Sequence, residues 1–196
     1  MKPVFAQPDQ VPRLVELLCQ SFIDDPIVQW MLPGADDRLP RLTELFRLCL
    51  RLRAFSEGEV LTTEKLQGTF VWSAGARVRA SFWRQMTQAG SFLRFAGPRR
   101  AGLLLSFFNT LEAQHPPEDH VYLQFMAVDP RQRGQGIARD LLRPVLELAD
   151  RKRLPCYGET AIEQNVYIWQ RYGLRAVGEI HFRSAPKLWK LRREPQ

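Results

Sequence analysis

The chain has 196 residues, 45% of them hydrophobic, which suits one globular domain over residues 1–196 and excludes a disordered chain. Lysine and arginine number 28 against 21 for aspartate and glutamate, giving a formal net charge of +7. That excess is compatible with nucleic acid, an anionic membrane surface or a phosphorylated ligand.

Membrane and export signals are not expected. No window approaches about 18 consecutive apolar residues, and the N-terminal residues lack the apolar stretch of a signal peptide, so we expect a cytoplasmic location. The three cysteines, Cys19, Cys49 and Cys156, lie far apart and are interpreted as reduced, buried thiols. The three histidines form no metal-binding pattern, so no metal site is expected.

Helical signals dominate the first third of the chain. A start signal at Asp9 precedes apolar residues at a 3.6-residue period. A short helix is predicted to begin at Pro26 and to end at Pro33-Gly34, and residues 36–55 are predicted to form a second long helix. Residues 58–75 have strand character on both sides of a turn near Glu64 and Lys65, which predicts a hairpin.

Residues 79–116 are helical in propensity and rich in aromatic side chains. We predict a helical insertion here, broken at Gly90 and at Gly97-Pro98. Crowded apolar helices form either ordinary core or the wall of a substrate cleft, and composition leaves both interpretations open.

From residue 120 strands and helices alternate. Strands are predicted over 120–128, 154–160 and 174–182, helices over 134–153 and 163–173, and a last extended run over 185–193. This alternation predicts an α/β (α+β) fold, with a mixed, partly parallel central β-sheet flanked by helices.

The segment "VDPRQRGQGIARDLL", residues 128–142, places glycines and arginines where a strand ends and a helix begins, at about Gln135. A helix N-terminus attracts anions, and glycine lets backbone amides approach a phosphate closely. The P-loop pattern and the three-glycine dinucleotide pattern both fail, because residue 139 is arginine. The pattern [QR]xxGx[GA] fits, through Arg131, Gly134 and Gly136.

With this motif the chain resembles the GNAT family of acetyl-CoA-dependent N-acetyltransferases. The resemblance rests on "FMAVDPRQRGQGIARDLLRPVLELAD", "LPCYGETAIEQNV" and "YGLRAVGEIHF", and covers residues of about 120–183 as a cofactor-binding core. It implies acetyl-CoA as co-substrate. The implied cofactor contacts are Met126, Ala127, Val128, Arg131, Arg133, Gly134, Gln135, Gly136, Ile137, Ala138 and Asn165.

Some of these implied roles are specific. Met126 and Val128 would offer backbone groups to the pantetheine arm, and amides of residues 133–138 would hold the pyrophosphate. Asn165 would bond the cofactor near its thiol end, or would simply cap a helix. The reaction's oxyanion is expected to meet the backbone N–H near Val128, at a break in sheet pairing.

The resemblance also implies three catalytic positions. Glu159 would act as a base, directly or through water, although an ordinary surface carboxylate or a partner of a nearby arginine is the alternative. Trp169 stands where many relatives have a tyrosine that protonates the leaving sulfur. An indole N–H does not release its proton at useful pH, and Tyr172, one turn further along, is the nearest phenol on the same helix face.

We therefore expect an acetyl-CoA-dependent N-acetyltransferase acting on a primary amine of a small molecule or peptide. The alternative is a catalytically weakened module that senses a CoA thioester, which Trp169 favours. A nucleic-acid-binding module would use the +7 charge but has no matching motif. No nucleic-acid or membrane partner is expected, and a homodimer is left open.

Overall fold

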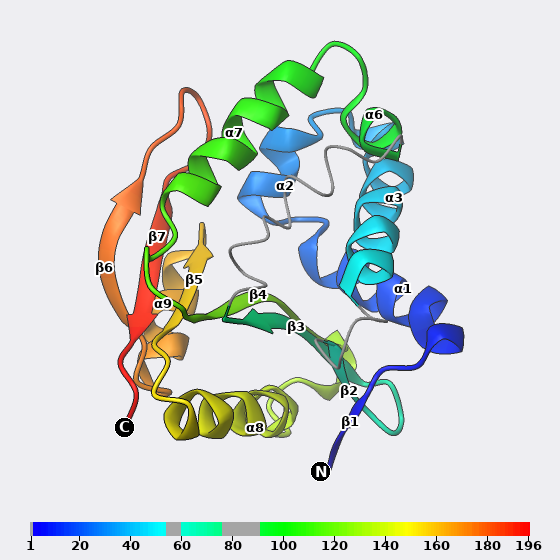
Figure 1. The fold of residues 1–196 in the computed structure, drawn as a ribbon. Helices are drawn as coiled ribbons and strands as arrows, with labels where there is room; N and C mark the ends of the chain where they lie inside the picture. The colour runs from blue at the N-terminus through cyan, green and yellow to red at the C-terminus, as the bar shows by residue number, and fades with distance from the viewer. Residues whose placement is uncertain (1, 54–59, 76–90) are drawn as a thin grey trace.

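A computed structural model describes residues 2–53, 60–75 and 91–196 (Figure 1). Seven strands form one sheet in the order β1-β2-β3-β4-β5-β7-β6, and within the described residues only the β4–β5 pair is parallel. The strands are β1 (Pro3–Phe5), β2 (Val60–Thr63), β3 (Gly68–Ala74), β4 (Val121–Val128), β5 (Cys156–Thr160), β6 (Arg175–Ile180) and β7 (Leu188–Arg193). The expected mixed, partly parallel sheet is confirmed.

Helices cover the sheet on both faces (Figure 1). One layer holds α1 (Val11–Phe22), α2 (Pro26–Met31), α3 (Ala35–Arg53), α6 (Ser91–Ala96) and α7 (Ala101–Ala113). The other layer holds α8 (Ile137–Arg151) and α9 (Glu163–Gln170). Each layer encloses its own apolar core against the sheet, as expected when each helix has one apolar face. No helix in the described part of the chain is long and apolar enough to cross a bilayer.

Within residues 2–53 and 91–196 the predicted helices are present with small shifts in their ends, and the part of the helical insertion predicted over 79–90 lies outside the described residues. The start signal at Asp9 lies in a short 3-10 turn, and α1 itself begins at Val11. Pro26 opens α2, as expected, and α8 begins at Ile137 rather than at Gln135, with Gly136 as its N-cap. The predicted break at Gly97 separates α6 from α7, whereas the break expected at Gly90 lies outside the described residues.

The sheet divides in its middle, between β4 and β5. These two strands pair only at Val121↔Cys156 and Tyr122↔Tyr157, after which they diverge. On its other side β4 stays paired with β3 as far as Val128, with one irregularity opposite the Val71–Trp72 step. Gln124 is the extra residue there, because Val71 pairs with Phe125 and Trp72 pairs with Leu123. Such a bulge bends the strand and redirects a side chain.

The start of α8 packs directly on the sheet at Gly68. An added Cβ at Gly68 would lie 2.7 Å from Cγ2 of Ile137, closer than real Cβ contacts come. Ile137 is only 2% exposed and is the first residue of α8. The absence of a side chain at Gly68 therefore fixes how closely the N-terminus of α8 approaches the end of β4.

Candidate functional site

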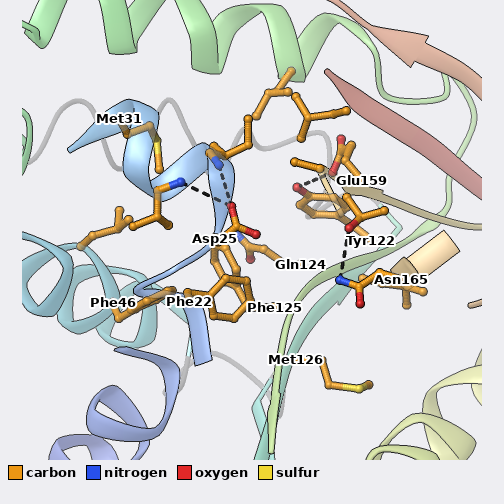
Figure 2. A pocket seen from close by; sticks show the side chains of 18 of the residues that line it. Phe22, Asp25, Met31, Phe46, Tyr122, Gln124, Phe125, Met126, Glu159 and Asn165 are labelled. Carbon is orange, nitrogen blue, oxygen red and sulfur yellow. Dashed lines mark hydrogen bonds between the residues drawn. The ribbon is translucent and has the colours of Figure 1, made fainter. Parts of the chain in front are cut away.

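A cavity of about 170 Å³ opens where β4 and β5 diverge (Figure 2). Its lining comes from both helical layers and from the sheet between them. The lining residues are Phe22, Asp25, Ile27, Val28, Met31, Leu45, Phe46, Phe70, Phe107, Phe108, Leu111, Tyr122, Leu123, Gln124, Phe125, Met126, Glu159, Thr160, Ala161, Asn165, Trp169 and Leu188. The cavity thus joins the face covered by α1, α2, α3 and α7 to the face covered by α9.

We call the part of the cavity walled by α1, α2, α3 and α7 the aromatic chamber. Phe22, Phe46 and Phe125 contact one another there, with ring centroids 5.4–5.8 Å apart. Phe107 and Phe108 of α7 are each 1% exposed and contribute another wall. Residues 79–116 were interpreted either as ordinary core or as the wall of a cleft. Within this range both interpretations apply to α7, because its apolar face belongs to the core and also lines the cavity.

Glu159 lies inside this cavity. Its side chain is 7% exposed, and its Oε2 accepts a hydrogen bond of 3.0 Å from the hydroxyl of Tyr122. Burial raises the pKa of Glu159 to about 7, against the lowering effect of hydrogen bonds from Tyr122 and Tyr157. The alternative of a surface carboxylate paired with an arginine is wrong, because this carboxyl is buried beside Tyr122 and His115.

Two further polar side chains of the chamber were not singled out in the sequence. Asp25 caps α2, and its Oδ1 accepts from the amides of Ile27 at 2.8 Å and Val28 at 3.3 Å. Gln124, redirected by the bulge, has both amide atoms buried without a hydrogen-bond partner in the part of the chain that the structure describes. A buried amide without partners is costly, so Gln124 is suited to bind a polar group of a ligand.

The helix α9 brings two of the predicted residues to the cavity. Asn165 and Trp169 lie one turn apart and both line it, whereas Tyr172 follows the end of the helix and packs against Trp169 with ring centroids 6.4 Å apart. Asn165 is not a helix cap, because the N-cap of α9 is Ile162. Its side-chain amide instead donates to Oγ1 of Thr160 at 3.3 Å, beside the cavity (Figure 2).

The glycine pair forms an open turn at the start of α8, which we call the amide cradle (residues 133–138). Gly134 and Gly136 have φ of 81° and 80°, a region that favours glycine. An added Cβ at Gly134 would meet none of the described residues within 4 Å, so the turn is open in front of this residue. Gln135 is exposed beside it, and the first amides of α8, from Ile137 and Ala138, have no acceptor within the helix.

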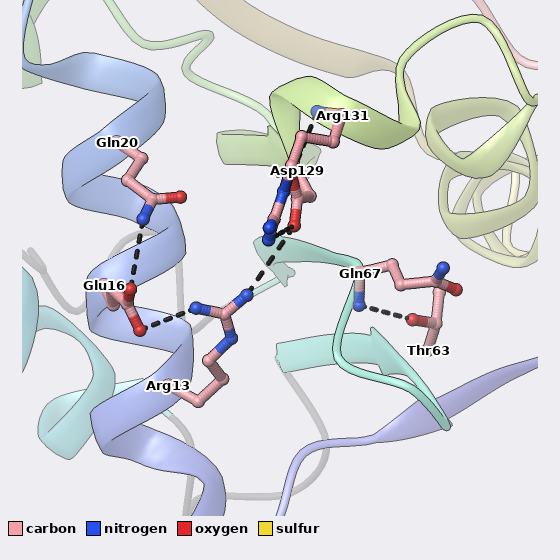
Figure 3. Close-up of polar contacts among 7 residues, drawn as sticks. All are labelled: Arg13, Glu16, Gln20, Thr63, Gln67, Asp129 and Arg131. Atoms are coloured by element: carbon pink, nitrogen blue, oxygen red, sulfur yellow. Dashed lines mark hydrogen bonds and ion pairs between the residues drawn. The ribbon is translucent and has the colours of Figure 1, made fainter.

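The arginines around the cradle differ in their partners (Figure 3). Arg131 forms a two-pronged ion pair with Asp129, with distances of 3.2 and 2.9 Å, and Arg13 lies 3.6 Å from the same carboxylate. These contacts hold the pKa of Asp129 at about 2. Arg133 is exposed and takes part in no ion pair among the described residues, so Arg133 rather than Arg131 supplies uncompensated charge.

The edge of β4 next to the cradle is open toward β5. The amide of Asp129 donates to Gln67, on the β3 side, at 2.8 Å. Because successive amides of a strand point to opposite edges, those of Val128 and Met126 face the open edge. Ala127 is 2% exposed and its side chain packs in the opposite core.

The break in sheet pairing that was expected near Val128 is present on the β5 side of β4, where the strand is unpaired after Tyr122, and not on the β3 side. Val128 pairs with Gly68 on β3, and the irregularity of this pairing lies at Gln124. A bulge cannot be read from the strand's composition, because it depends on how β3 and β4 are aligned. The open edge of β4 therefore begins after Tyr122, with the bulge close to its start.

Comparison with known proteins agrees with this architecture. Residues 55–172, more than half of the chain, match the model of the acetyltransferase (GNAT) family. An uncharacterised N-acetyltransferase of Schizosaccharomyces pombe is 23% identical over 167 residues, which cover 80% of this chain and 67% of that protein. An uncharacterised protein of Mycobacterium leprae is 26% identical over 69% of this chain, which spans only 37% of that relative.

Solved structures share the fold. A Corynebacterium glutamicum protein described as histone acetyltransferase HPA2 and related acetyltransferase has a TM-score of 0.74 at 19% identity, covering 100% of this chain and 96% of that one. Mosquito arylalkylamine N-acetyltransferase like 5b has a TM-score of 0.62 at 14% identity, covering 97% of each chain. A NatC complex bound to a peptide and CoA has a TM-score of 0.52 at 12% identity, covering 100% of each chain.

These matches support acetyl transfer in general and leave the acceptor open. In this chain β4 lies beside β5 in the strand order, diverges from it, and then leads into the amide cradle before α8. The chain belongs to the GNAT family of acetyltransferases.

Proposed function

We propose that this protein transfers an acetyl group from acetyl-CoA to the primary amine of a small molecule. The observation that carries the proposal is the continuity of the cavity, which links Asn165 and Trp169 to Glu159 and to the aromatic chamber. A thioester entering from the side of α9 and an amine held in the chamber would meet beside one buried carboxyl.

The residues present fit a phosphorylated co-substrate with a long arm. The cradle offers glycines of positive φ, free helix amides and the uncompensated charge of Arg133, which together suit a pyrophosphate. The open edge of β4 offers the amides of Met126 and Val128 to an extended, amide-bearing chain. When bound, acetyl-CoA would supply the acetyl group, and its thiol would leave.

The chamber favours a small, mainly apolar acceptor over a long peptide. An engineered cavity of about 150 Å³ in another protein accommodates benzene, so about 170 Å³ is room for a single ring or a short chain. Aromatic walls suit such a body, while Asp25, Gln124 and Glu159 offer polar contacts to its amine and to one further polar group. The mosquito arylalkylamine N-acetyltransferase of the same fold makes arylalkylamines a reasonable first set of acceptors.

Glu159 would take up the proton that the acceptor must lose. An alkylamine with a pKa near 10 is only about one part in a thousand neutral at pH 7, so a nearby base is needed. Above neutral pH a carboxyl whose pKa is about 7 is mainly ionised, so it can accept this proton. The hydroxyl of Tyr122 would hold the carboxyl in place during the transfer.

Trp169 supports a second candidate function, that of a CoA-thioester sensor. It lines the cavity, and its indole cannot protonate a departing thiolate. A thiol of pKa about 8.5 can leave unaided at a cost of ~2 kcal/mol, which is compatible with turnover. A protein that binds the thioester without turnover would instead act as a CoA-thioester sensor.

Two measurements separate these functions. Binding should appear as thermal stabilisation by acetyl-CoA, worth ~2.7 kcal/mol at a hundredfold excess over the Kd. Thiol release from acetyl-CoA, recorded with a panel of small aromatic and aliphatic amines and confirmed by product mass, should identify turnover. Thermal stabilisation by acetyl-CoA without thiol release for any amine would favour the sensor. The absence of both stabilisation and thiol release would reject acetyl-CoA as the co-substrate.

A further inference from the structure

Two histidines outside the proposed reaction site form a series of contacts that ends at Glu159. Nδ1 of His120 lies 2.9 Å from the backbone oxygen of Glu118, and Nε2 of His120 lies 3.0 Å from Nδ1 of His115. Nε2 of His115 then lies 3.8 Å from Oε1 of Glu159. His120 is 1% exposed, and the side chains of His115 and Glu159 are 10% and 7% exposed.

These contacts fix where the protons lie on both imidazole rings. A backbone carbonyl only accepts hydrogen bonds, so Nδ1 of His120 must carry a proton. Burial lowers the pKa of His115 to about 4 and also lowers that of His120, so both rings are neutral at pH 7. Nε2 of His120 is therefore an acceptor, Nδ1 of His115 is the donor to it, and Nε2 of His115 presents a lone pair.

That lone pair faces the one oxygen of Glu159 that Tyr122 does not contact. Tyr122 donates to Oε2, whereas Oε1 is buried and no donor of the described residues lies within hydrogen-bond distance of it. An ionised carboxylate opposite a lone pair is repelled, while a protonated Oε1 can turn toward that lone pair and donate to it. The neutral pair of rings therefore favours the protonated carboxyl over the ionised one.

The other groups around Glu159 act in both directions. Glu112, on α7, is negative and also favours the protonated form, and Asp25 faces the cavity from α2. The hydroxyl of Tyr157, on β5, stays neutral because burial and Glu159 raise its pKa, and like Tyr122 it lowers the pKa of Glu159 as a hydrogen-bond donor, but burial outweighs both hydroxyls. Lys190 lies opposite Glu159 on β7, but its ammonium donates to Gln114 at 3.1 Å.

The charged groups around His120, at the end of the histidine pair away from Glu159, act on the pKa of His120. Glu118 and Asp119 raise its pKa, and Arg192, which bonds the carboxylate of Glu118 at 2.6 Å, lowers it. Burial outweighs them, so the ring stays neutral.

We propose that His115 and His120 are a pair of positioning residues whose locked tautomer holds the proton on Glu159 at neutral pH. The consequence for the reaction rests on the proposed function, but the protonation of Glu159 does not. In that reaction the pair would set the pH at which Glu159 becomes a base.

The tautomers can be observed directly in the unaltered protein. Long-range ¹H–¹⁵N correlation spectra distinguish a protonated Nδ1 from a protonated Nε2 in each histidine. We expect Nδ1–H on both His115 and His120 at pH 7. A proton on Nε2 of His115 would overturn the proposal, and this result needs neither a variant nor any substrate.

Two substitutions test the effect on Glu159. His115→Gln replaces the lone pair with an amide that can donate to Oε1, and His120→Phe frees His115 to carry its proton on Nε2. Both variants should lower the midpoint of the Glu159 titration, followed by ¹³C-carboxyl NMR without substrate, by about one pH unit, because a donor stabilises the carboxylate. Glu159→Gln identifies the signal.

His181→Gln is the matched control. The ring of His181 is 70% exposed and bonds Glu179, away from the cavity, so this variant should leave the midpoint unchanged. Unchanged midpoints in His115→Gln and His120→Phe would overturn the proposal. If the midpoints move but no variant releases thiol from acetyl-CoA, the histidine pair stands and the proposed function fails. Where both hold, the acid limb of the rate profile moves by the same amount.

Discussion

The amide cradle and the aromatic chamber are built in opposite ways. The cradle is made by one short run, residues 133–138, and presents mainly backbone amides at the start of α8. The chamber takes its polar groups from α2, β4 and β5, at Asp25, Gln124 and Glu159, and presents buried side chains. A co-substrate shared across a family can be held by a local backbone motif, whereas acceptor recognition depends on residues that only the fold brings together.

The sharpest way to test this division is to remove the carboxyl of the chamber. Glu159→Gln keeps the shape of the side chain but cannot accept a proton, so turnover should fall by about 10²–10⁴-fold while acetyl-CoA affinity stays within a few-fold. In the unaltered protein the rate should rise with pH through about 7, since Glu159 must be ionised to act as a base. Steady-state rates between pH 5.5 and pH 9 check both expectations. A Glu159→Gln variant that keeps the full rate and the same acid limb would exclude Glu159 as the base.

The converse experiment damages the cradle alone. Gly134→Asp adds a negative charge and a side chain where a pyrophosphate would bind, and we expect the Kd for CoA to rise by about 100-fold or more. The variant should fold, because space in front of Gly134 is open and aspartate tolerates a positive φ at modest cost.

Gly75→Asp is the control for backbone strain, because Gly75 also has a positive φ (65°) and no described residue within 4 Å of an added Cβ. Calorimetric titration with CoA compares the two variants. Equal affinity in Gly134→Asp and in the unaltered protein would place the phosphates elsewhere.

Trp169 lines the cavity from α9, on the side away from the chamber's helices, so its substitution tests the boundary between cofactor binding and acceptor binding. Trp169→Ala should weaken acetyl-CoA binding by about tenfold, because it opens space beside the cofactor's reactive end. Trp169→Tyr should keep the affinity within a few-fold and hold or raise turnover, by ~10²-fold at most, since a phenol can donate a proton. Turnover and KM for acetyl-CoA in the three proteins decide the matter. If Trp169→Ala matches the unaltered protein in both, this side chain is outside the site.

The smallest expected effect distinguishes two arginines of the cradle. Arg133→Ala should weaken CoA binding by several-fold and reduce its dependence on salt, because Arg133 has uncompensated charge. Arg131→Ala should have a weaker effect, because Asp129 already neutralises that guanidinium. Calorimetry at two salt concentrations compares them. A larger loss in Arg131→Ala would mean that the Asp129 pair opens when CoA binds.

The same division explains what could be predicted from the sequence. The strands and helices after residue 120 follow from periodicity, and the cradle follows from two glycines at the mouth of a helix. The ion pair of Arg131 with Asp129 could not be predicted, because it depends on the conformation of the turn. The N-cap interpretation of Asn165 failed because α9 begins earlier, after Ile162.

The chamber was predicted much less completely. Residues 20–55 and 79–116 were rich in apolar side chains, but no local pattern showed that Asp25 faces Glu159 across a cavity. Gln124 lies in what looks like a regular strand, and its bulge depends on the register with β3. His115 and His120 were judged only against metal-binding spacings, and their contact with each other requires the end of α7 to meet the start of β4.

The divergence of β4 from β5 gives the sheet an interior edge in addition to its two outer ones. An unpaired strand edge can recruit another strand, and proteins usually cover or shorten such edges. Here the gap is bordered by helices on both faces, so an occupant that fits it would be narrow and extended and would carry its own amides. A ligand bound there would complete the hydrogen bonding of the sheet, and its binding energy would then contribute to the stability of the fold itself.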